Sequence, residues 1–150
     1  MGKRSVKKPE KNDLLKERAK VKEKFSKGEN FAIKKKIESG RIYINSTYNN
    51  TIITLTDEIG NVVFWSSAGH IGFKGTKKGT SFAASKVAEF ISDKVKKLGV
   101  KQLSIFTKGI GPGREGALRG LGQQGLNIIF IKDVTPIPHN GCRARKVRRV

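Results

Sequence analysis

The stretch from Asp133 to Val150 limits where the folded part of this chain can end. Pro136 and Pro138 lack the amide hydrogen that a helix interior or a central strand requires, so neither element continues past them. Five cationic residues follow, with no acidic residue among them: Arg143, Arg145, Lys146, Arg148 and Arg149. Such a tail buries too little apolar surface to offset its ordering entropy, so we expect it to be disordered until it binds a polyanion.

A tail that serves only solubility is the alternative. Arginine favours the nucleic-acid interpretation, because its planar guanidinium fits phosphate better than the ammonium of lysine. The formal net charge is +20, from 32 Lys and Arg against 12 Asp and Glu in 150 residues. Self-repulsion at this charge destabilises a compact state, and a bound polyphosphate relieves it. The charge therefore predicts a nucleic-acid partner.

Membrane binding is a weaker alternative. No apolar run approaches the ~18 residues of a spanning helix, and the N-terminus lacks the apolar segment of a signal peptide. The single Cys142 excludes an intramolecular disulfide. We expect a cytoplasmic or organelle-matrix protein with no cofactor and no homo-oligomer.

Composition divides the chain into three parts. Residues 1–39 form a basic N-terminal extension, rich in Lys and Glu, which we expect to be a disordered arm. Residues 40–133 form the body, and residues 134–150 form the basic tail.

Hydrophobic periodicity and turn residues predict seven elements in the body. Strands are expected at 41–48, 51–57, 62–66, 100–107 and 126–132, and helices at 82–98 and 114–124. The order βββαβαβ predicts one α/β domain with a mixed five-stranded sheet that the helices cover. The continuous apolar run Ile128–Ile131 predicts that the last strand is covered on both faces.

Several residues mark the boundaries of these elements. Asn49 and Asn50 tolerate positive φ, which is typical of a hairpin turn between the first two strands. Thr80 or Ser81 can cap the longer helix at its start, and Gly99 is placed to end it.

The first candidate binding loop runs from Gly69 to Thr80. Three lysines lie within five residues there, and they repel one another unless an anion is bound: Lys74, Lys77 and Lys78. Gly72 and Gly75 allow close approach to a ligand, and the following helix start offers free amides. Phe73 either packs on the body or stacks on a base. A flexible surface loop is the alternative.

The second candidate loop contains Gly111-Pro-Gly-Arg-Glu-Gly116, which matches the dinucleotide pattern G-x-G-x-x-G. We reject a dinucleotide site, because the motif precedes the last strand, Pro112 stiffens the turn, and the chain has no room for a second mononucleotide half. The amides of Gly111 and Gly113 together with Arg114 can still bind a phosphate of any origin.

The helix that follows carries three glycines that weaken it: Gly116, Gly120 and Gly122. Each costs up to ~1 kcal/mol relative to Ala, which indicates close backbone approach either to the sheet or to a partner. Arg119 either binds phosphate or pairs with Glu115 one turn away.

The sequence shows no convincing arrangement of metal-binding or catalytic residues. His70, His139 and Cys142 lack a fourth ligand for zinc, so the His139-x-x-Cys142 spacing reflects either chance or RNA contact, and we count His139 among the candidate RNA-binding residues. No paired carboxylates or nucleophile arrangement stands out, and we expect no enzymatic activity. A small nucleotide-binding or nuclease-like enzyme and a DNA-compacting or chaperone protein remain as alternatives.

Four motifs together resemble the small-subunit ribosomal protein eleven family. They are Asn49-Asn-Thr-Ile52, Gly72-Phe-Lys-Gly75, Lys108-Gly-Ile-Gly-Pro-Gly-Arg-Glu115 and Asp133-Val-Thr-Pro-Ile-Pro-His-Asn-Gly-Cys-Arg143. The resemblance covers roughly Gly40 to the C-terminus. It departs from the family pattern in a longer N-terminal arm, at His70-Ile71, and at Ile110, where proline is more usual.

The resemblance implies a ribonuclease-H-like body that binds 16S-type rRNA in the platform of the small subunit, near the mRNA exit. It implies ribosomal proteins six, seven, eighteen and twenty-one as neighbours, and a structural role without catalysis. The rRNA-binding residues expected here are Lys74, Lys77, Lys78, Arg114, Arg119, His139, Arg143, Arg145, Lys146, Arg148 and Arg149.

Overall fold

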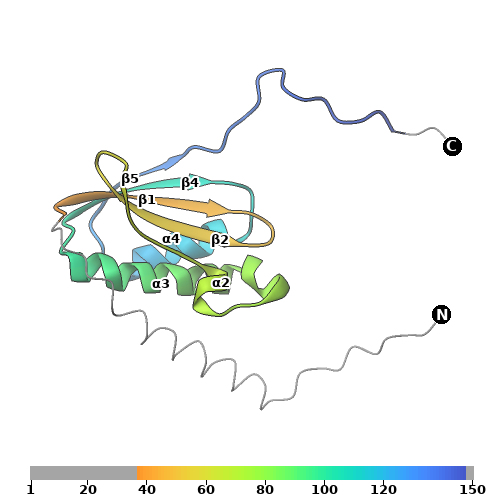
Figure 1. The fold of residues 1–150 in the computed structure, drawn as a ribbon. Coiled ribbons are helices and arrows are strands. Elements are labelled where there is room, and N and C mark those ends of the chain that lie inside the picture. Colours follow the sequence, from red (N-terminus) through yellow and green to blue (C-terminus); the bar gives the residue numbers. More distant parts are fainter. Residues whose placement is uncertain (1–36, 148–150) are drawn as a thin grey trace, which may run out of the picture.

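Five strands form a single sheet in the order β3-β2-β1-β4-β5. The computed structural model describes residues 37–147 (Figure 1). The strands are β1 (Ser39–Ser46), β2 (Thr51–Asp57), β3 (Val62–Ser67), β4 (Gln102–Lys108) and β5 (Ile128–Asp133). The helices are α2 (Ala68–Ile71), α3 (Ser81–Leu98) and α4 (Gly113–Gln123), with one 3-10 turn, η1 (Gly75–Gly79).

The sheet is mixed, as the sequence predicted. β2 pairs antiparallel with both β1 and β3, whereas β4 pairs parallel with β1 and with β5. In this register Tyr43 of β1 lies between Thr54 of β2 and Phe106 of β4. All five expected strands are present, with boundaries shifted by two residues or fewer.

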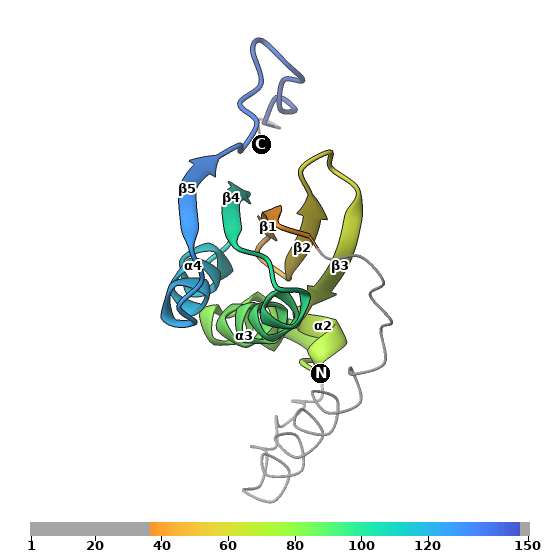
Figure 2. The ribbon, with the colours of Figure 1, turned by 90° about the vertical axis from the view of Figure 1, so that its left-hand side faces the viewer.

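α3 and α4 lie on the same face of the sheet (Figures 1 and 2). α3 connects β3 to β4 and α4 connects β4 to β5, so both crossovers move in the same direction across the sheet. Crossovers of one hand that advance in one direction place their helices on one side. The opposite face of the sheet therefore carries no helix among the described residues.

The prediction that β5 is covered on both faces is wrong. β5 is the edge strand, and only Ile128 is half-buried while the five residues that follow are exposed. An apolar run shows that a strand needs cover, but it does not show whether that cover lies within the same chain.

The core lies between the sheet and α3. The residues of α3 at helical spacing are buried as predicted: Ala84, Val87, Ala88, Ile91, Val95 and Leu98. They pack against alternate residues of β1 and β2 that are also buried: Ile42, Ile44, Ile53 and Leu55. Thr80 caps α3, because its Oγ1 accepts from the amide of Ala83 at 3.2 Å. Gly99 ends the helix in the left-handed conformation, with φ of 71°.

Two local features differ from expectation. The turn between β1 and β2 closes through the Thr47 amide, which donates to the Asn50 carbonyl at 2.9 Å, and neither Asn49 nor Asn50 has positive φ. The lysine-rich loop is not irregular throughout, since it contains α2 and η1.

Two glycines of α4, Gly116 and Gly120, approach α3 rather than the sheet. A side chain on Gly116 would overlap the carbonyl oxygen of Ser81. A Cβ on Gly120 would lie 2.9 Å from the Cβ of Ala88 and 3.2 Å from the Cα of Ser85. In addition, the Ser85 hydroxyl donates to the Gly116 carbonyl at 2.9 Å. The weakened helix thus allows α3 and α4 to pack backbone to backbone.

The expected N-terminal arm lies outside the described residues, apart from Ile37, which is buried, Glu38 and the first residue of β1. Within the described part of the chain, no helix has the length and apolar character that crossing a membrane requires.

The α3–α4 contact predicts opposite effects for two glycine substitutions in one helix. Gly120→Ala forces Ala88 and Ser85 to move, so we expect a loss of about 1–3 kcal/mol in the free energy of unfolding. Gly122→Ala meets nothing within 4 Å, and the higher helix propensity of Ala should stabilise the protein by up to ~1 kcal/mol. Urea unfolding measures both values. Equal effects of the two substitutions would contradict this packing.

Candidate nucleic-acid interface

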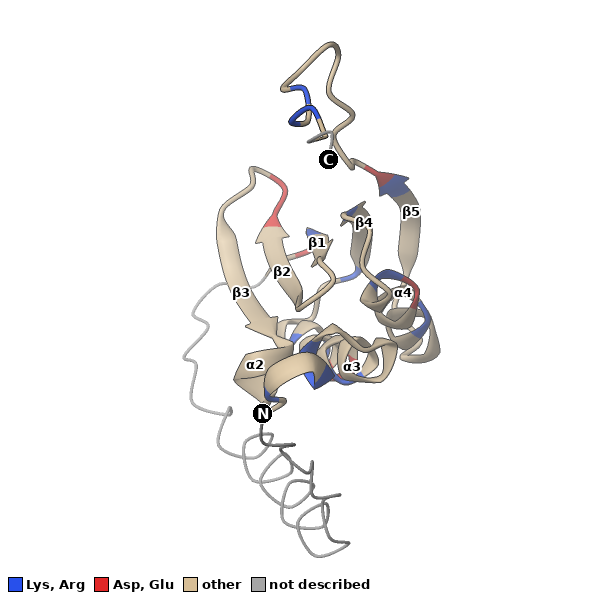
Figure 3. Cartoon of the chain, turned by 90° about the vertical axis from the view of Figure 1, so that its right-hand side faces the viewer, with Lys and Arg blue, Asp and Glu red and all other residues tan. Residues whose placement is uncertain are grey.

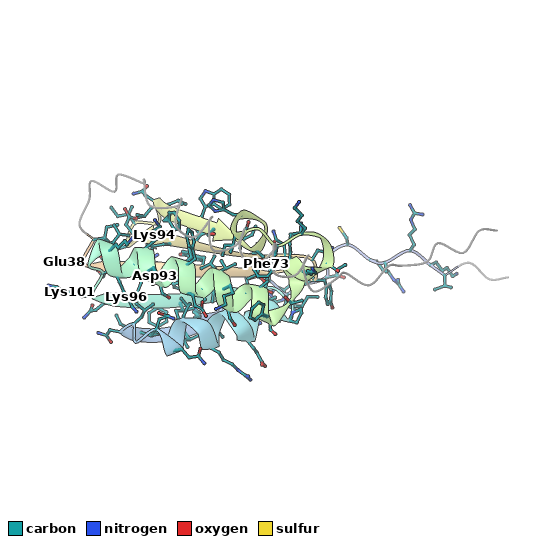
Figure 4. The ribbon with its side chains drawn as sticks, turned by 90° about the horizontal axis from the view of Figure 1, so that it is seen from below. Glu38, Phe73, Asp93, Lys94, Lys96 and Lys101 are labelled. Carbon is teal, nitrogen blue, oxygen red and sulfur yellow. The ribbon has the colours of Figure 1, made fainter. Side chains whose placement is uncertain are left out.

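All the predicted binding segments of the body begin at one end of the sheet. The register places Ser46 beside Thr51, Asn45 beside Lys108, and Thr107 beside Asp133. The β1–β2 turn, the segment before α3, the loop before α4 and the start of the tail therefore meet at this end, which we call the loop end. Figure 4 shows Phe73 of the first loop far from Glu38 and Lys101, which mark the opposite end of the body.

The first loop packs closely against the β1–β2 turn. Gly79, at the end of η1, is buried, and a side chain there would overlap the carbonyl oxygen of Tyr48. Phe73 is half-buried against the core, with its ring edge-on to that of Phe82 at 6.1 Å. Packing, one of the two roles considered for Phe73, is therefore its role in the body. Lys74 and Lys77 are exposed, and Lys78 is half-exposed.

The second loop packs closely against the same turn from its other side. The Gly111 amide donates to the Ser46 carbonyl at 3.1 Å, and a side chain on Gly111 would overlap the backbone of Thr47. Gly113 is buried against the hydroxyl of Thr51. The glycines at 79, 111 and 113 thus fix the two loops to the body rather than leaving bare backbone for a ligand. Gly75, by contrast, has φ of 56°, and a Cβ there would meet nothing within 4 Å.

Arg114 connects the second loop to the strand from which the tail departs. Its Nη2 lies 2.5 Å from Oδ2 of Asp133, and its Nη1 donates to the Gly109 carbonyl at 3.3 Å. Oδ1 of Asp133 accepts from the amide and hydroxyl of Thr135 at 2.9 and 2.7 Å. The side chain predicted to bind phosphate therefore also has a structural role, which is to hold the exit of the tail.

The same contacts stabilise the ionised form of Asp133. The hydroxyl and amide of Thr135, followed by the guanidinium of Arg114, lower the pKa of this carboxyl from 3.8 to about 2. Asp133 thus keeps its charge, and its hold on Arg114 and Thr135, well below neutral pH.

Arg119 pairs with Glu115, one of the two roles that the sequence allowed. Nη2 lies 3.2 Å from Oε2 across one turn of α4, and both side chains are 78% exposed. An ion pair so accessible to water contributes little to stability, and the arginine can exchange Glu115 for a phosphate at little cost.

The tail leaves the body at the end of β5 and extends away from it (Figure 1). The Val134 amide still donates to the Thr107 carbonyl at 2.8 Å, but from Pro136 to Val147 every residue is exposed and none belongs to a helix or strand. His139, Arg143, Arg145 and Lys146 lie in this segment. Arg148 and Arg149 lie outside the described residues.

Charge is unevenly distributed between the two ends of the body. The loop end carries six cations: Lys74, Lys77, Lys78, Lys108, Arg114 and Lys132. Its two acidic residues, Glu115 and Asp133, are both paired with arginine. The opposite end carries five cations, Arg41, Lys94, Lys96, Lys97 and Lys101, and four carboxylates, Glu38, Asp57, Glu58 and Asp93. Figure 3 views the loop end and shows the basic residues before α3, on α4 and on the tail. The excess of positive charge thus lies at the loop end.

Sequence reasoning missed several residues of the loop end. Lys108 ends β4, is exposed and belongs to the recognised Lys108–Glu115 motif, which is the signal that could have identified it. Three apolar side chains are also exposed there: Tyr48 at 69%, Phe82 at 63% and Ile110 at 68%. Their exposure depends on how the loops fold and has no signal in the sequence.

His70, outside the family pattern, belongs to α2. Its ring centroid lies 6.0 Å from that of Trp65 and 6.2 Å from that of Phe90, and its Nδ1 is 3.3 Å from the Ser66 hydroxyl. Within residues 37–147 no three side chains of His, Cys, Asp or Glu come together in a way that could hold a metal ion.

Comparison with known proteins agrees with the resemblance seen in the motifs. The sequence profile of the family described as "Ribosomal protein S11" matches residues 40–149. A relative named "Small ribosomal subunit protein uS11", from Endomicrobium trichonymphae, is 59% identical over 119 residues, which cover 78% of this chain and 91% of the relative.

The contacts of Asp133 predict a pH dependence of stability. Because its pKa is lower in the folded state than the usual 3.8, the carboxylate stabilises the fold fully above about pH 5 and loses this effect as the pH falls toward 2. We therefore expect the melting temperature of the natural chain to exceed that of the Asp133→Asn variant at pH 6. The difference should shrink between pH 4 and 2, as the lowered pKa requires. Thermal unfolding across this range measures it, and a difference that does not change with pH would contradict the assigned contacts.

Proposed function

Since this chain belongs to the ribosomal protein S11 family, we propose that it binds the rRNA of the small ribosomal subunit through the loop end of its body and the basic tail. As a family member it is a structural constituent of that subunit. The observation that carries the proposal is the physical joining of the two loops and the tail exit at one end of the sheet, where cations outnumber carboxylates.

The geometry favours recognition of RNA backbone and shape. The cations of the loop end stand on a rigid frame, because Gly79 and Gly111 fix both loops to the β1–β2 turn. The cations of the tail stand on an exposed segment that can follow RNA strands. A-form grooves hide most base edges from side chains, so phosphates and 2′-hydroxyls are the groups these residues can reach.

Each group of cations has a different role in RNA binding, which we assign from its position in the fold. Lys74, Lys77, Lys78 and Lys108 are assigned to direct phosphate contact because of their place at the loop end. Arg114 orients the tail through Asp133 and offers its remaining N–H groups to RNA. Arg143, Arg145 and Lys146, with Arg148 and Arg149 beyond them, neutralise converging strands. His139 adds a contact near the start of the tail.

The finer location follows the family resemblance. We place the protein in the platform, near the mRNA exit, bound to 16S-type rRNA, with ribosomal proteins six, seven, eighteen and twenty-one as neighbours. A ribonuclease-H-like body and a cytoplasmic or organelle-matrix ribosome belong to the same proposal. The role is non-catalytic, and both acidic residues of the loop end are engaged in ion pairs with arginine.

The tail should account for a measurable part of the salt dependence of RNA binding. Replacing Arg143, Arg145, Lys146, Arg148 and Arg149 with glutamine removes five phosphate contacts. At ~0.7 per contact, we expect the slope of log K against log[salt] to become shallower by about 3.5 units. A salt titration against small-subunit rRNA measures the slope. An unchanged slope would remove the tail from the binding surface.

Substitution of two matched lysines tests whether RNA binds through the loop end or through the net positive charge of the whole protein. Lys74→Gln should weaken rRNA binding and reduce the slope by ~0.7, because Lys74 lies at the loop end. Lys101→Gln removes the same charge at the opposite end, where Lys101 pairs with Glu38 at 3.7 Å, and should leave both quantities unchanged. Equal loss of affinity for both variants would show that net charge, rather than this surface, determines binding.

A further inference from the structure

The helix-free face of the sheet carries a packed row of aromatic rings next to the exposed edge strand. The rings of Tyr43 and Phe106 stack across β1 and β4 with centroids 5.0 Å apart, and Phe130 of β5 meets Phe106 edge-on at 5.5 Å. On β5, Phe130 is 45% exposed, and its neighbours Ile129 and Ile131 are 57% and 56% exposed. Ile131 pairs with Ile105 of the core, so Ile129 and Ile131 lie toward the helix-covered face and Phe130 toward the helix-free face. We call the three rings and these two isoleucines the β5 patch, which includes both sides of the free edge.

The exposure of the β5 patch is unusual for a strand of this composition. Four consecutive apolar residues, Ile128–Ile131, normally occur where both faces of a strand are covered. Here β5 is the end of the sheet, and no strand among the described residues pairs with its outer side. A long apolar edge with free N–H and C=O groups promotes aggregation, and native proteins cover such edges.

From this we propose that the β5 patch is a docking site for another protein. The partner adds an extended segment along the free edge of β5 and places apolar side chains on Phe130 and Phe106. The inference rests on the proposed function in one respect, because we expect this partner in the small ribosomal subunit.

RNA fits the β5 patch less well than protein. Tyr43 and Phe106 stack on each other at 15°, so one face of each ring is already covered and only the other could stack on a base. Ile129 and Ile131 have no group that binds phosphate. A protein segment matches both features, because apolar side chains pack on ring edges and on isoleucines, and a strand edge pairs with backbone.

Charge also limits the choice of protein. The cations of the five strands are Arg41, Lys108 and Lys132, and Lys132 lies beside Phe106 in the register. The acidic residues of the strands are Asp57 and Asp133, and both are engaged, Asp57 with Asn61 and Asp133 with Arg114 and Thr135. A segment that carries a carboxylate near its apolar side chains is therefore the complementary partner.

The same charges disfavour two partners from within this chain. Residues 1–36 contain 14 Lys and Arg against 5 Asp and Glu, so they would bring more positive charge to Lys132. A second copy would bring another net charge of +20 and another Lys132. A different protein, with acidic and apolar side chains, fits best.

Site-specific crosslinking in intact small subunits tests the inference. p-Benzoylphenylalanine replaces Ile131 in one full-length chain and Ile59 in a second chain. Ile59 is an isoleucine 86% exposed in the β2–β3 turn and serves as the matched control. After irradiation of purified subunits, we expect position 131 to form an adduct with a peptide of another protein, with a yield at least tenfold above that of position 59.

Each other result overturns the inference. An adduct from position 131 to RNA, to residues 1–36 or to a second copy would identify a different occupant of the patch. Absence of any adduct would show that nothing occupies it. In any of these cases the chain is still present in the particle, so the proposed function stands. Absence of the chain from small subunits would instead overturn the proposed function.

Hydrogen exchange of the unsubstituted chain gives a second measurement that no substitution can disturb. Amides of Ile128–Asp133 should exchange at least tenfold more slowly in the small subunit than in the free protein, whereas those of the Glu58–Asn61 turn should change little. Unchanged exchange in β5 would show that its edge stays open.

The charge of the partner is tested separately. Lys132→Glu should lower the adduct yield from position 131 at least tenfold if a carboxylate of the partner faces Lys132, and an unchanged yield would overturn that part of the inference.

Discussion

The contact of two glycine-containing loops with one tight turn is the constraint on which the basic surface of this protein depends. Gly79 approaches the turn from the segment before α3, and Gly111 approaches it from the loop before α4. Any larger side chain at either position would overlap the backbone of Tyr48 or Thr47 and push the loop outward. Close packing at these two points holds lysines from separate parts of the chain at one end of the sheet.

Charge then distinguishes that end from the rest of the body. Among the described residues, four carboxylates accompany five cations at the opposite end, whereas the loop end has two carboxylates, which pair with Arg114 and Arg119. Arg114 also positions the tail, through an aspartate whose pKa of about 2 keeps it ionised. The fold therefore connects a rigid set of cations to an exposed one, which is the arrangement that a protein embedded among RNA strands requires.

The sequence predicted the elements because their signals are local. Enrichment in Ile, Thr and Tyr around a turn signal identified β1 and β2, helical spacing identified α3, and Thr80 and Gly99 marked its ends. The position of β5 at the sheet edge could not be predicted, because strand order depends on pairing between distant segments. The partner of Arg114 lies 19 residues away, and the partners of Gly116 and Gly120 lie on another helix, so neither was visible in the motif itself. The structure brings both predicted loops to one end of the sheet, but Gly79, Gly111 and Gly113 pack on the body instead of offering bare backbone to a ligand.

Protein–RNA crosslinking with mass spectrometry of intact small subunits that contain this chain tests the central claim most directly. We expect peptides that carry a crosslinked nucleotide to come from Gly72–Gly79, from Lys108–Arg114 and from the tail after Pro138. Peptides that span Lys94 to Lys101, at the opposite end of the body, should carry none. Nucleotides crosslinked mainly to that opposite end, with the loop end and tail unmodified, would contradict the account.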